Sequence, residues 1–274
     1  EQGRKFTNKI WNALRLIKGW KVEKNKQPES AKEAINWFKN KINHAVKEIN
    51  NSYSRYRISE ALMITYKLIW DDFCSWYLEI IKPDYGKSID EKTYKETINQ
   101  LEKLLKILHP FMPFLTEEIW HLIDSKENDI IISNWPKEEK YKDNIIEEFD
   151  IISEIVSSIR NFRKQKNISN KEQFNLLVKK NKNLHDKMDP IICKLGNIEN
   201  IEYLDEKPNN LYSFMVRTNE YFIQLSYEFN FEEEINSLLH FLNLSWDDNI
   251  SNYREKAINK KINTPSYSQV IKPI

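Results

Sequence analysis

The chain has 274 residues, of which 42 are Lys or Arg and 41 are Asp or Glu, so its formal net charge is +1. This balance excludes a general polyanion binder, and any contact with nucleic acid must come from a local basic face. No apolar run approaches the roughly 20 residues that a membrane-spanning helix needs, and the N-terminus does not resemble a signal peptide. Cys74 and Cys193 lack CxxC spacing, which favours a reduced, cytoplasmic protein.

The first 166 residues show the periodicity of amphipathic helices. Ser30 and Glu33 form a capping-box pattern, and Asp90 is a plausible N-cap. The expected helices are residues 2–18, ending near Gly19, a segment that begins at Ser30, residues 59–81, a segment from Asp90 to His109, and residues 145–164.

Pro110 and Pro113 interrupt this helical pattern. Each proline lacks an amide donor and pushes the preceding residue toward an extended conformation. We therefore expect one helix to stop near His109 and a second to start around Thr116, with the Thr116 hydroxyl as N-cap. The surrounding side chains predict a corner wedged inside a helical bundle, namely Phe111, Met112, Phe114, Leu115, Ile119 and Trp120.

The residue pattern changes at about residue 170, where the helical periodicity ends. Short β-rich runs predict strands over residues 174–178, 198–204, 211–216 and 221–225, with a helix over 184–195 that is interrupted near Pro190. Residues 130–132 are too few for a helix and are expected to run extended. Four glycines in the whole chain leave no room for a glycine-rich phosphate loop.

Six segments with unusual residue patterns follow one another along the chain: 3–15, 56–62, 70–79, 108–120, 133–136 and 159–164. In this order they resemble the anticodon-binding region of valyl-tRNA synthetases, over about residues 1–225. The enzymes for isoleucine and leucine share that architecture, and the first and third segments favour valine. The resemblance implies a mainly α fold, with a class I synthetase anticodon-binding helical bundle over residues 1–168 and a small α/β appendage over 169–225.

Residues 226–274 resemble the C-terminal end of a bacterial sulfotransferase, and we expect a helical tail there. This junction is compatible with a gene fusion, a frame error or an assembly chimera, and a diverged synthetase tail remains an alternative. The tail lacks the phosphosulfate loop of sulfotransferases.

Side chains suited to RNA binding line one side of the first helix. The five that fall within about 80° on a helical wheel are Arg4, Asn8, Trp11, Arg15 and Lys18. Guanidinium groups reach phosphates or stack, an indole stacks on bases, and an amide reads a base edge. In an arbitrary protein such a stripe is more often a solvated face. The resemblance implies instead that this helix lies beside the anticodon loop, with Asn12 as a further contact. Many relatives carry an aromatic residue where this chain has Leu16.

A second basic cluster contains Arg160, Arg163, Lys164 and Lys166. The spacing places Arg160, Arg163 and Lys164 on one helix face, where they could hold tRNA backbone phosphates. The alternative is a helix C-terminus that favours cations without binding RNA.

The remaining patterns argue against catalysis by this chain. Its five histidines are scattered without metal-ligand spacing, so we expect no metal site. No adenylate-forming segment is present, and the resemblance implies that ATP and Mg²⁺ bind only in a catalytic domain outside this chain. The expected partner is the anticodon stem-loop of a valine tRNA. We expect the chain to be monomeric and to have no membrane partner. A sulfotransferase or its remnant and a helical scaffold that binds no RNA are the alternatives.

Overall fold

The computed structural model describes residues 1–123, 128–180, 186–208 and 211–224. These residues form two compact units. The first contains the described residues of 1–153 and 186–195, and the second contains those of 154–180 and 196–224. The boundary at residue 153 lies inside a helix, whereas the sequence predicts a boundary at 168. The fold is mainly α, as predicted.

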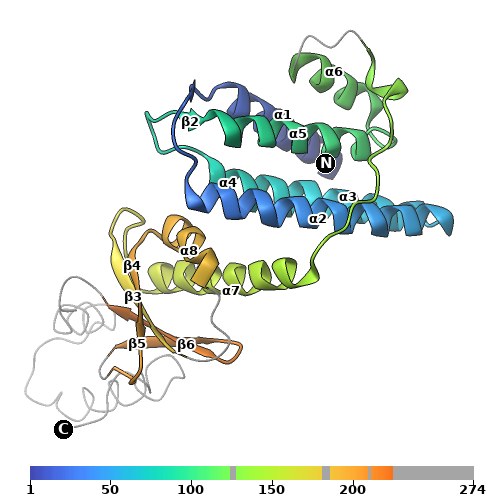
Figure 1. The fold of residues 1–274 in the computed structure, drawn as a ribbon. Helices are drawn as coiled ribbons and strands as arrows, with labels where there is room; N and C mark the ends of the chain where they lie inside the picture. The colour runs from blue at the N-terminus through green and yellow to red at the C-terminus, as the bar shows by residue number, and fades with distance from the viewer. Residues whose placement is uncertain (124–127, 181–185, 209–210, 225–274) are drawn as a thin grey trace, which may run out of the picture. The chain divides into compact units, whose positions relative to one another are not determined.

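Helices dominate the first unit (Figure 1). They are α1 (Gln2–Lys18), α2 (Glu29–Ser54), α3 (Ile58–Lys67), η1 (Leu68–Tyr77), α4 (Leu78–Ile81), α5 (Glu91–Leu108), α6 (Pro113–Ile123) and the first part of α7 (Asp143–Gln165). The shorter elements are β1 (Val22–Glu23) paired in parallel with β2 (Ile89–Asp90), η2 (Ile130–Ile132), η3 (Asp186–Met188) and α8 (Asp189–Gly196).

The predicted helix over residues 59–81 is one helical arm made of α3, η1 and α4. Its middle part, η1, is a π-helix. The Ser75 hydroxyl donates to the Trp70 carbonyl at 2.9 Å, and the Leu78 amide bonds the Phe73 carbonyl, five residues earlier. These wider turns bury side chains at intervals of four, namely Ile69, Phe73, Tyr77 and Ile81. An apolar pattern read at the α-helical period does not predict this widening.

Two predicted helix N-caps have different outcomes. An Asp90 carboxylate oxygen accepts a hydrogen bond from the Thr93 amide at 2.8 Å, so this N-cap is confirmed. The capping box at Ser30 is wrong, because α2 already begins at Glu29 after Pro28. Ser30 lies within the first turn and is buried.

At the proline corner, the predicted end of the first helix is confirmed, whereas the predicted start of the second helix and its Thr116 cap are wrong. Helix α5 ends at Leu108, as predicted. Helix α6 starts at Pro113 rather than Thr116, because the first helical position tolerates a missing amide. The Thr116 hydroxyl contacts the carbonyls of Met112 and Pro113 and the His109 ring instead of capping a helix. Phe114 is 91% exposed, so the corner is only partly enclosed.

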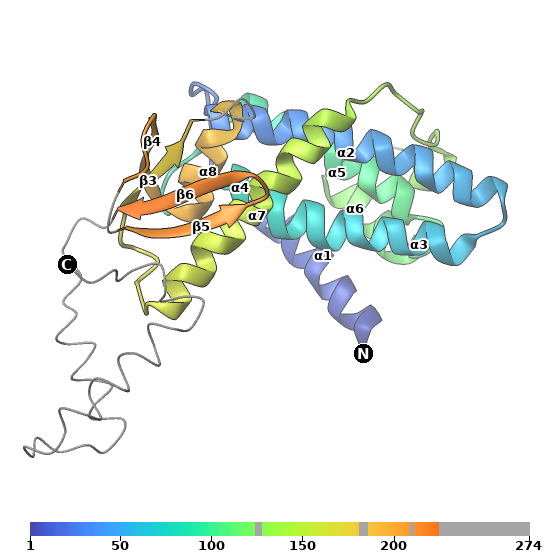
Figure 2. The ribbon, with the colours of Figure 1, turned by 90° about the horizontal axis from the view of Figure 1, so that it is seen from below.

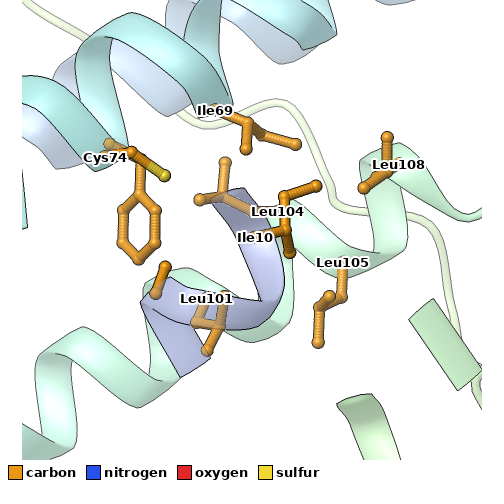
Figure 3. A pocket seen from close by; sticks show the side chains of 9 residues that line it. Ile10, Ile69, Cys74, Leu101, Leu104, Leu105 and Leu108 are labelled. Atoms are coloured by element: carbon orange, nitrogen blue, oxygen red, sulfur yellow. The ribbon is translucent and has the colours of Figure 1, made fainter. Parts of the chain in front are cut away.

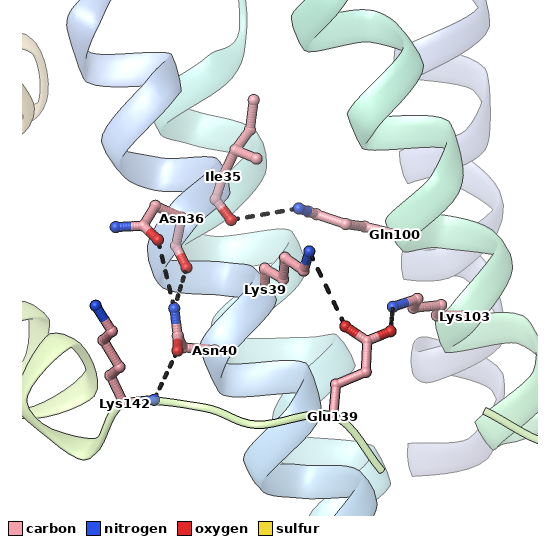
Figure 4. Close-up of polar contacts among 8 residues, drawn as sticks. All are labelled: Ile35, Asn36, Lys39, Asn40, Gln100, Lys103, Glu139 and Lys142. Carbon is pink, nitrogen blue, oxygen red and sulfur yellow. Dashed lines mark hydrogen bonds and ion pairs between the residues drawn. The ribbon is translucent and has the colours of Figure 1, made fainter. Parts of the chain in front are cut away.

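Residues 133–142, which precede α7, are held along α2. Residues 130–132 form the 3₁₀-helix η2, which corrects the expected extended conformation. Farther along, the Asn40 side chain accepts from the Lys142 amide at 2.7 Å, and Glu139 lies 3.1 Å from Lys103 and 4.0 Å from Lys39 (Figure 4). These contacts tie the approach to α7 onto α2 and α5.

The second unit contains the small sheet that the sequence predicts after the bundle. The strands β3 (Phe174–Lys179), β4 (Ile198–Leu204), β5 (Tyr212–Val216) and β6 (Asn219–Gln224) form the order β4-β3-β6-β5 (Figure 2). Strand β3 pairs in parallel with β4 and antiparallel with β6, which also pairs antiparallel with β5. Phe162 of α7 packs in this unit on Phe174 and Tyr212. Pro190 lies in the first turn of α8, so it starts that helix rather than interrupting it.

The predicted tail, residues 226–274, lies outside the described residues. Among the helices that the structure describes, none has a stretch long and apolar enough to cross a membrane.

Asp72 is a mostly buried carboxylate in η1 with weak charge compensation. Burial raises its pKa to about 6, the ammonium of Lys41 at 3.9 Å partly opposes this change, and Asp71 and Asp150 add to it. The folded protein therefore holds the Asp72 proton more tightly than the unfolded chain does.

We predict that Asp72→Asn stabilises the protein at neutral pH. A folded pKa above the ordinary value of 3.8 means that the wild type loses stability as pH rises from about 4 to 6. The stability that the wild type loses through this raised pKa is at most about 3 kcal/mol. In the variant Lys41 loses its ion-pair partner, which reduces the gain in stability to about 1–2 kcal/mol. Urea unfolding at neutral pH and near pH 4 measures the difference, which should vanish at the lower pH. Equal stabilisation at both values would contradict the assignment.

We predict that Asp90→Ala lowers the free energy of unfolding by about 1 kcal/mol, because the Thr93 amide loses its acceptor. Asp84→Ala is the matched control, since that exposed carboxylate forms a surface ion pair with Lys87 and its loss should cost less than about 0.5 kcal/mol. Urea unfolding followed by circular dichroism compares the two variants. Similar losses would mean that the cap contributes nothing beyond surface charge.

Candidate nucleic-acid interface

Helix α1 divides into a buried and an exposed side, as the sequence predicts. The buried side chains are Phe6, Ile10, Ala13, Leu14 and Ile17. The predicted RNA-binding residues are on the other side, where Arg4, Asn8, Asn12, Arg15 and Lys18 are exposed and Trp11 is half-buried. We call these six residues the α1 stripe. The structure thus brings together every candidate predicted for this helix.

Aromatic packing at the N-terminal half of α1 sets the direction of the stripe. The Phe6 ring stacks on Tyr66 at 4.9 Å and on Trp70 at 6.2 Å between ring centroids. The Lys9 ammonium lies 4.0 Å from the centre of the Trp70 ring and donates to the Ser75 hydroxyl at 3.0 Å. Lys9 is not among the residues predicted from the sequence, because its position lies between the two sides of α1 and its partners come from η1.

The space beneath α1 is too small for a ligand. Between α1, η1 and α5 lies a cavity of about 10 Å³ whose lining is apolar (Figure 3). Burial raises the pKa of the Cys74 thiol beside this cavity to about 12, so the thiol is inert at neutral pH. We conclude that this interior holds α1 in place and performs no chemistry.

The C-terminal end of the α1 stripe is fixed to α6. The Lys18 ammonium donates to the Leu122 carbonyl at 2.6 Å. An ammonium carries three donors, so Lys18 keeps hydrogens for a second partner while its position is constrained.

The second predicted cluster needs a correction at Arg163. This side chain is only 3% exposed, and its guanidinium donates to the carbonyls of Gly196, Asn197 and Ser169 at 2.9–3.3 Å. It also lies over the Phe174 ring at 4.2 Å. Arg163 therefore connects α7 to the loops around the sheet and is not available to RNA.

Arg160 and Lys164 are exposed on α7. They are four residues apart and so share an exposed face of α7. Arg163 is not part of this exposed face, because its side chain is buried. These two basic side chains belong to the second unit and the α1 stripe belongs to the first.

A groove between α2 and α5 offers a poorer site for an anion. Its volume is about 380 Å³. The lining contains the lysines Lys39, Lys103 and Lys106 and the carboxylates Glu96 and Glu102. Glu139 also lies beside Lys39 and Lys103 (Figure 4). Because the charges balance locally, this groove does not concentrate positive potential as the α1 stripe does.

Comparison with known proteins agrees with this geometry. Residues 36–180, more than half of the chain, match the family model described as the anticodon-binding domain of tRNA ligase. The chain belongs to this family. The family match begins within α2, so α1 precedes it.

The chain is also similar to curated valine–tRNA ligases. It is 49% identical to that of Christiangramia forsetii over 93% of this chain and 30% of that protein. It is 45% identical to that of Phocaeicola vulgatus, over 87% of this chain and 27% of that protein. It is 31% identical to that of Thermotoga maritima, over 84% of this chain and 27% of that protein. The chain spans less than a third of these relatives, and the resemblance to valyl-tRNA synthetases is confirmed.

The similarity to the Christiangramia protein covers a larger share of the chain than residues 1–225 represent. It therefore continues into the C-terminal segment. The sulfotransferase resemblance of residues 226–274 is unconfirmed and stays a prediction.

We predict that Arg163→Ala lowers the free energy of unfolding by at least about 2 kcal/mol, because carbonyls near the sheet of the second unit lose their donors. Lys164→Ala, which removes an exposed positive charge from the same helix, is the matched control and should change it by less than about 0.5 kcal/mol. Urea unfolding monitored by circular dichroism gives both values. A cost for Arg163→Ala as small as that of the control would contradict its role as a buried connector.

Proposed function

We propose that this chain recognises the anticodon stem-loop of a valine tRNA as part of an ATP-dependent valine–tRNA ligase. The observation that carries the proposal is the α1 stripe, in which exposed basic and amide groups and the half-buried Trp11 indole lie on one side of a helix. Family membership and the valine–tRNA ligase relatives support the choice of tRNA and of valine.

In this proposal the side chains of the α1 stripe bind different parts of the RNA, according to their chemistry. Arg4, Arg15 and Lys18 neutralise phosphates of the loop, and arginine does so with a planar, bidentate donor pair. Trp11 offers a face on which an unstacked base can rest. Asn8 and Asn12 carry both donors and acceptors, so they can read the edge of a base. Arg160 and Lys164 contact backbone phosphates.

The remaining parts of the reaction are assigned to other domains of the ligase. ATP and Mg²⁺ bind there, and this chain acts by binding and positioning the tRNA. We further propose that the chain acts as a monomer in the cytoplasm. Recognition by hydrogen bonds gives discrimination because a wrong base leaves polar groups unpaired, at a cost of about 1–3 kcal/mol each.

The experiment is a binding titration of this chain with a valine tRNA transcript and with the same transcript carrying a changed anticodon. We predict a preference for the valine anticodon. In the double variant Arg4→Ala/Arg15→Ala, affinity should fall at least about tenfold. The slope of log affinity against log salt should become shallower by about 0.7 for each phosphate that the variant no longer neutralises. Fluorescence anisotropy at low and moderate salt measures both quantities.

The matched control is Lys67→Ala/Lys92→Ala, which removes two exposed positive charges from α3 and α5. It should leave the anticodon preference and most of the affinity intact. An equal loss in both double variants would indicate nonspecific charge attraction, and absence of binding by the wild type would favour a scaffold without RNA.

A further inference from the structure

Three potential metal ligands come together at the C-terminal end of α6. Glu117 and His121 lie four residues apart and so share a helix face, and Asp129 lies just before η2. Their ligand atoms, two carboxylate oxygens and one ring nitrogen, are all within 4.8 Å of one another. No metal site is predicted from the sequence, because the histidines lack metal-ligand spacing and there is no adjacent cysteine pair. This cluster contains a single histidine.

The distances around His121 fit a bound cation as well as the hydrogen bond that its ring forms with Asp129. Its Nε2 atom lies 3.2 Å from a carboxylate oxygen of Glu117 and 3.2 Å from one of Asp129. A ring nitrogen carries at most one hydrogen, which cannot point at both oxygens. Bonds of about 2.0–2.1 Å to a tetrahedral zinc ion place its ligands about 3.3 Å apart, which agrees with both separations.

The backbone around Asp129 is fixed to α6 on both sides. The Trp120 indole donates to the Asn128 carbonyl at 3.1 Å, and the Ile130 amide donates to a Glu117 carboxylate oxygen at 2.8 Å. Asp129 lies between these two bonded residues, so its carboxylate is held near His121 before any ion arrives. Such preorganisation lowers the cost of assembling a metal site.

We propose that Glu117, His121 and Asp129 bind a zinc ion, with water completing a tetrahedral coordination shell. The side chains are 29–64% exposed, which gives both the ion and the water access. A ligand set of one imidazole and two carboxylates suits zinc, whereas calcium and magnesium prefer oxygen ligands alone. The ion balances the two carboxylates and connects the end of α6 to the residues before η2. This proposal does not depend on the RNA-binding function.

The test is a calorimetric titration of the tag-free chain with zinc chloride at neutral pH, together with thermal unfolding in the presence and absence of zinc. We expect one zinc ion per chain and an increase in Tm, since a ligand that binds the folded state stabilises it. His121→Ala and Asp129→Asn should lose both effects. Glu117→Gln keeps an acceptor for the Ile130 amide, so its expected loss of at least about tenfold in zinc affinity reports the metal rather than the fold.

Glu118→Gln is the matched control, because it removes the same charge from the neighbouring, exposed position of α6. It should bind zinc as the wild type does. Circular dichroism in the absence of zinc checks that each variant is folded. If the wild type gives no zinc binding, or if His121→Ala binds zinc with the affinity of Glu118→Gln, the proposal is wrong.

Discussion

The packing of α1 on the helical arm is the interaction on which the candidate interface depends. A helix with basic side chains on one side presents them to a ligand only if its opposite side is buried in a fixed orientation. Phe6 provides this contact by stacking on Tyr66 and Trp70. Lys9 adds a directional constraint, because its ammonium contacts both the Trp70 ring and the Ser75 hydroxyl. Burial holds α1 against the arm, and these polar contacts determine its rotation about its own axis.

The π-helix is what brings both partners of Lys9 to the same place. Trp70 and Ser75 are five residues apart, which places them about 140° apart around a regular α-helix. In η1 the wider turn brings them together, and the Ser75 hydroxyl also donates to the Trp70 carbonyl. Widened helical turns occur frequently at functional sites. Here the widened segment supports the helix that carries the α1 stripe.

The sequence predicts well the features that depend on local periodicity. The bounds of α1, the N-cap at Asp90 and the strand over residues 198–204 follow from patterns within a few residues. Features decided by distant partners could not be predicted in this way. A helical wheel treats Arg160 and Arg163 as equivalent, yet Arg163 alone reaches the carbonyls of Gly196 and Asn197, more than thirty residues away. The zinc ligands likewise become neighbours only when the residues before η2 return to α6.

The end of α6 connects the proposed zinc site to the α1 stripe. Lys18 donates to the carbonyl of Leu122, the residue directly after His121. A zinc ion at Glu117, His121 and Asp129 can therefore act on the stripe in two physical ways. It restrains the helix end to which Lys18 is bonded, and it cancels two negative charges near a cationic surface. The second effect is electrostatic and weakens within about 10 Å at moderate salt, whereas restraint of the helix end does not depend on salt. Because of this difference, the salt dependence of any zinc effect on RNA binding identifies which one operates.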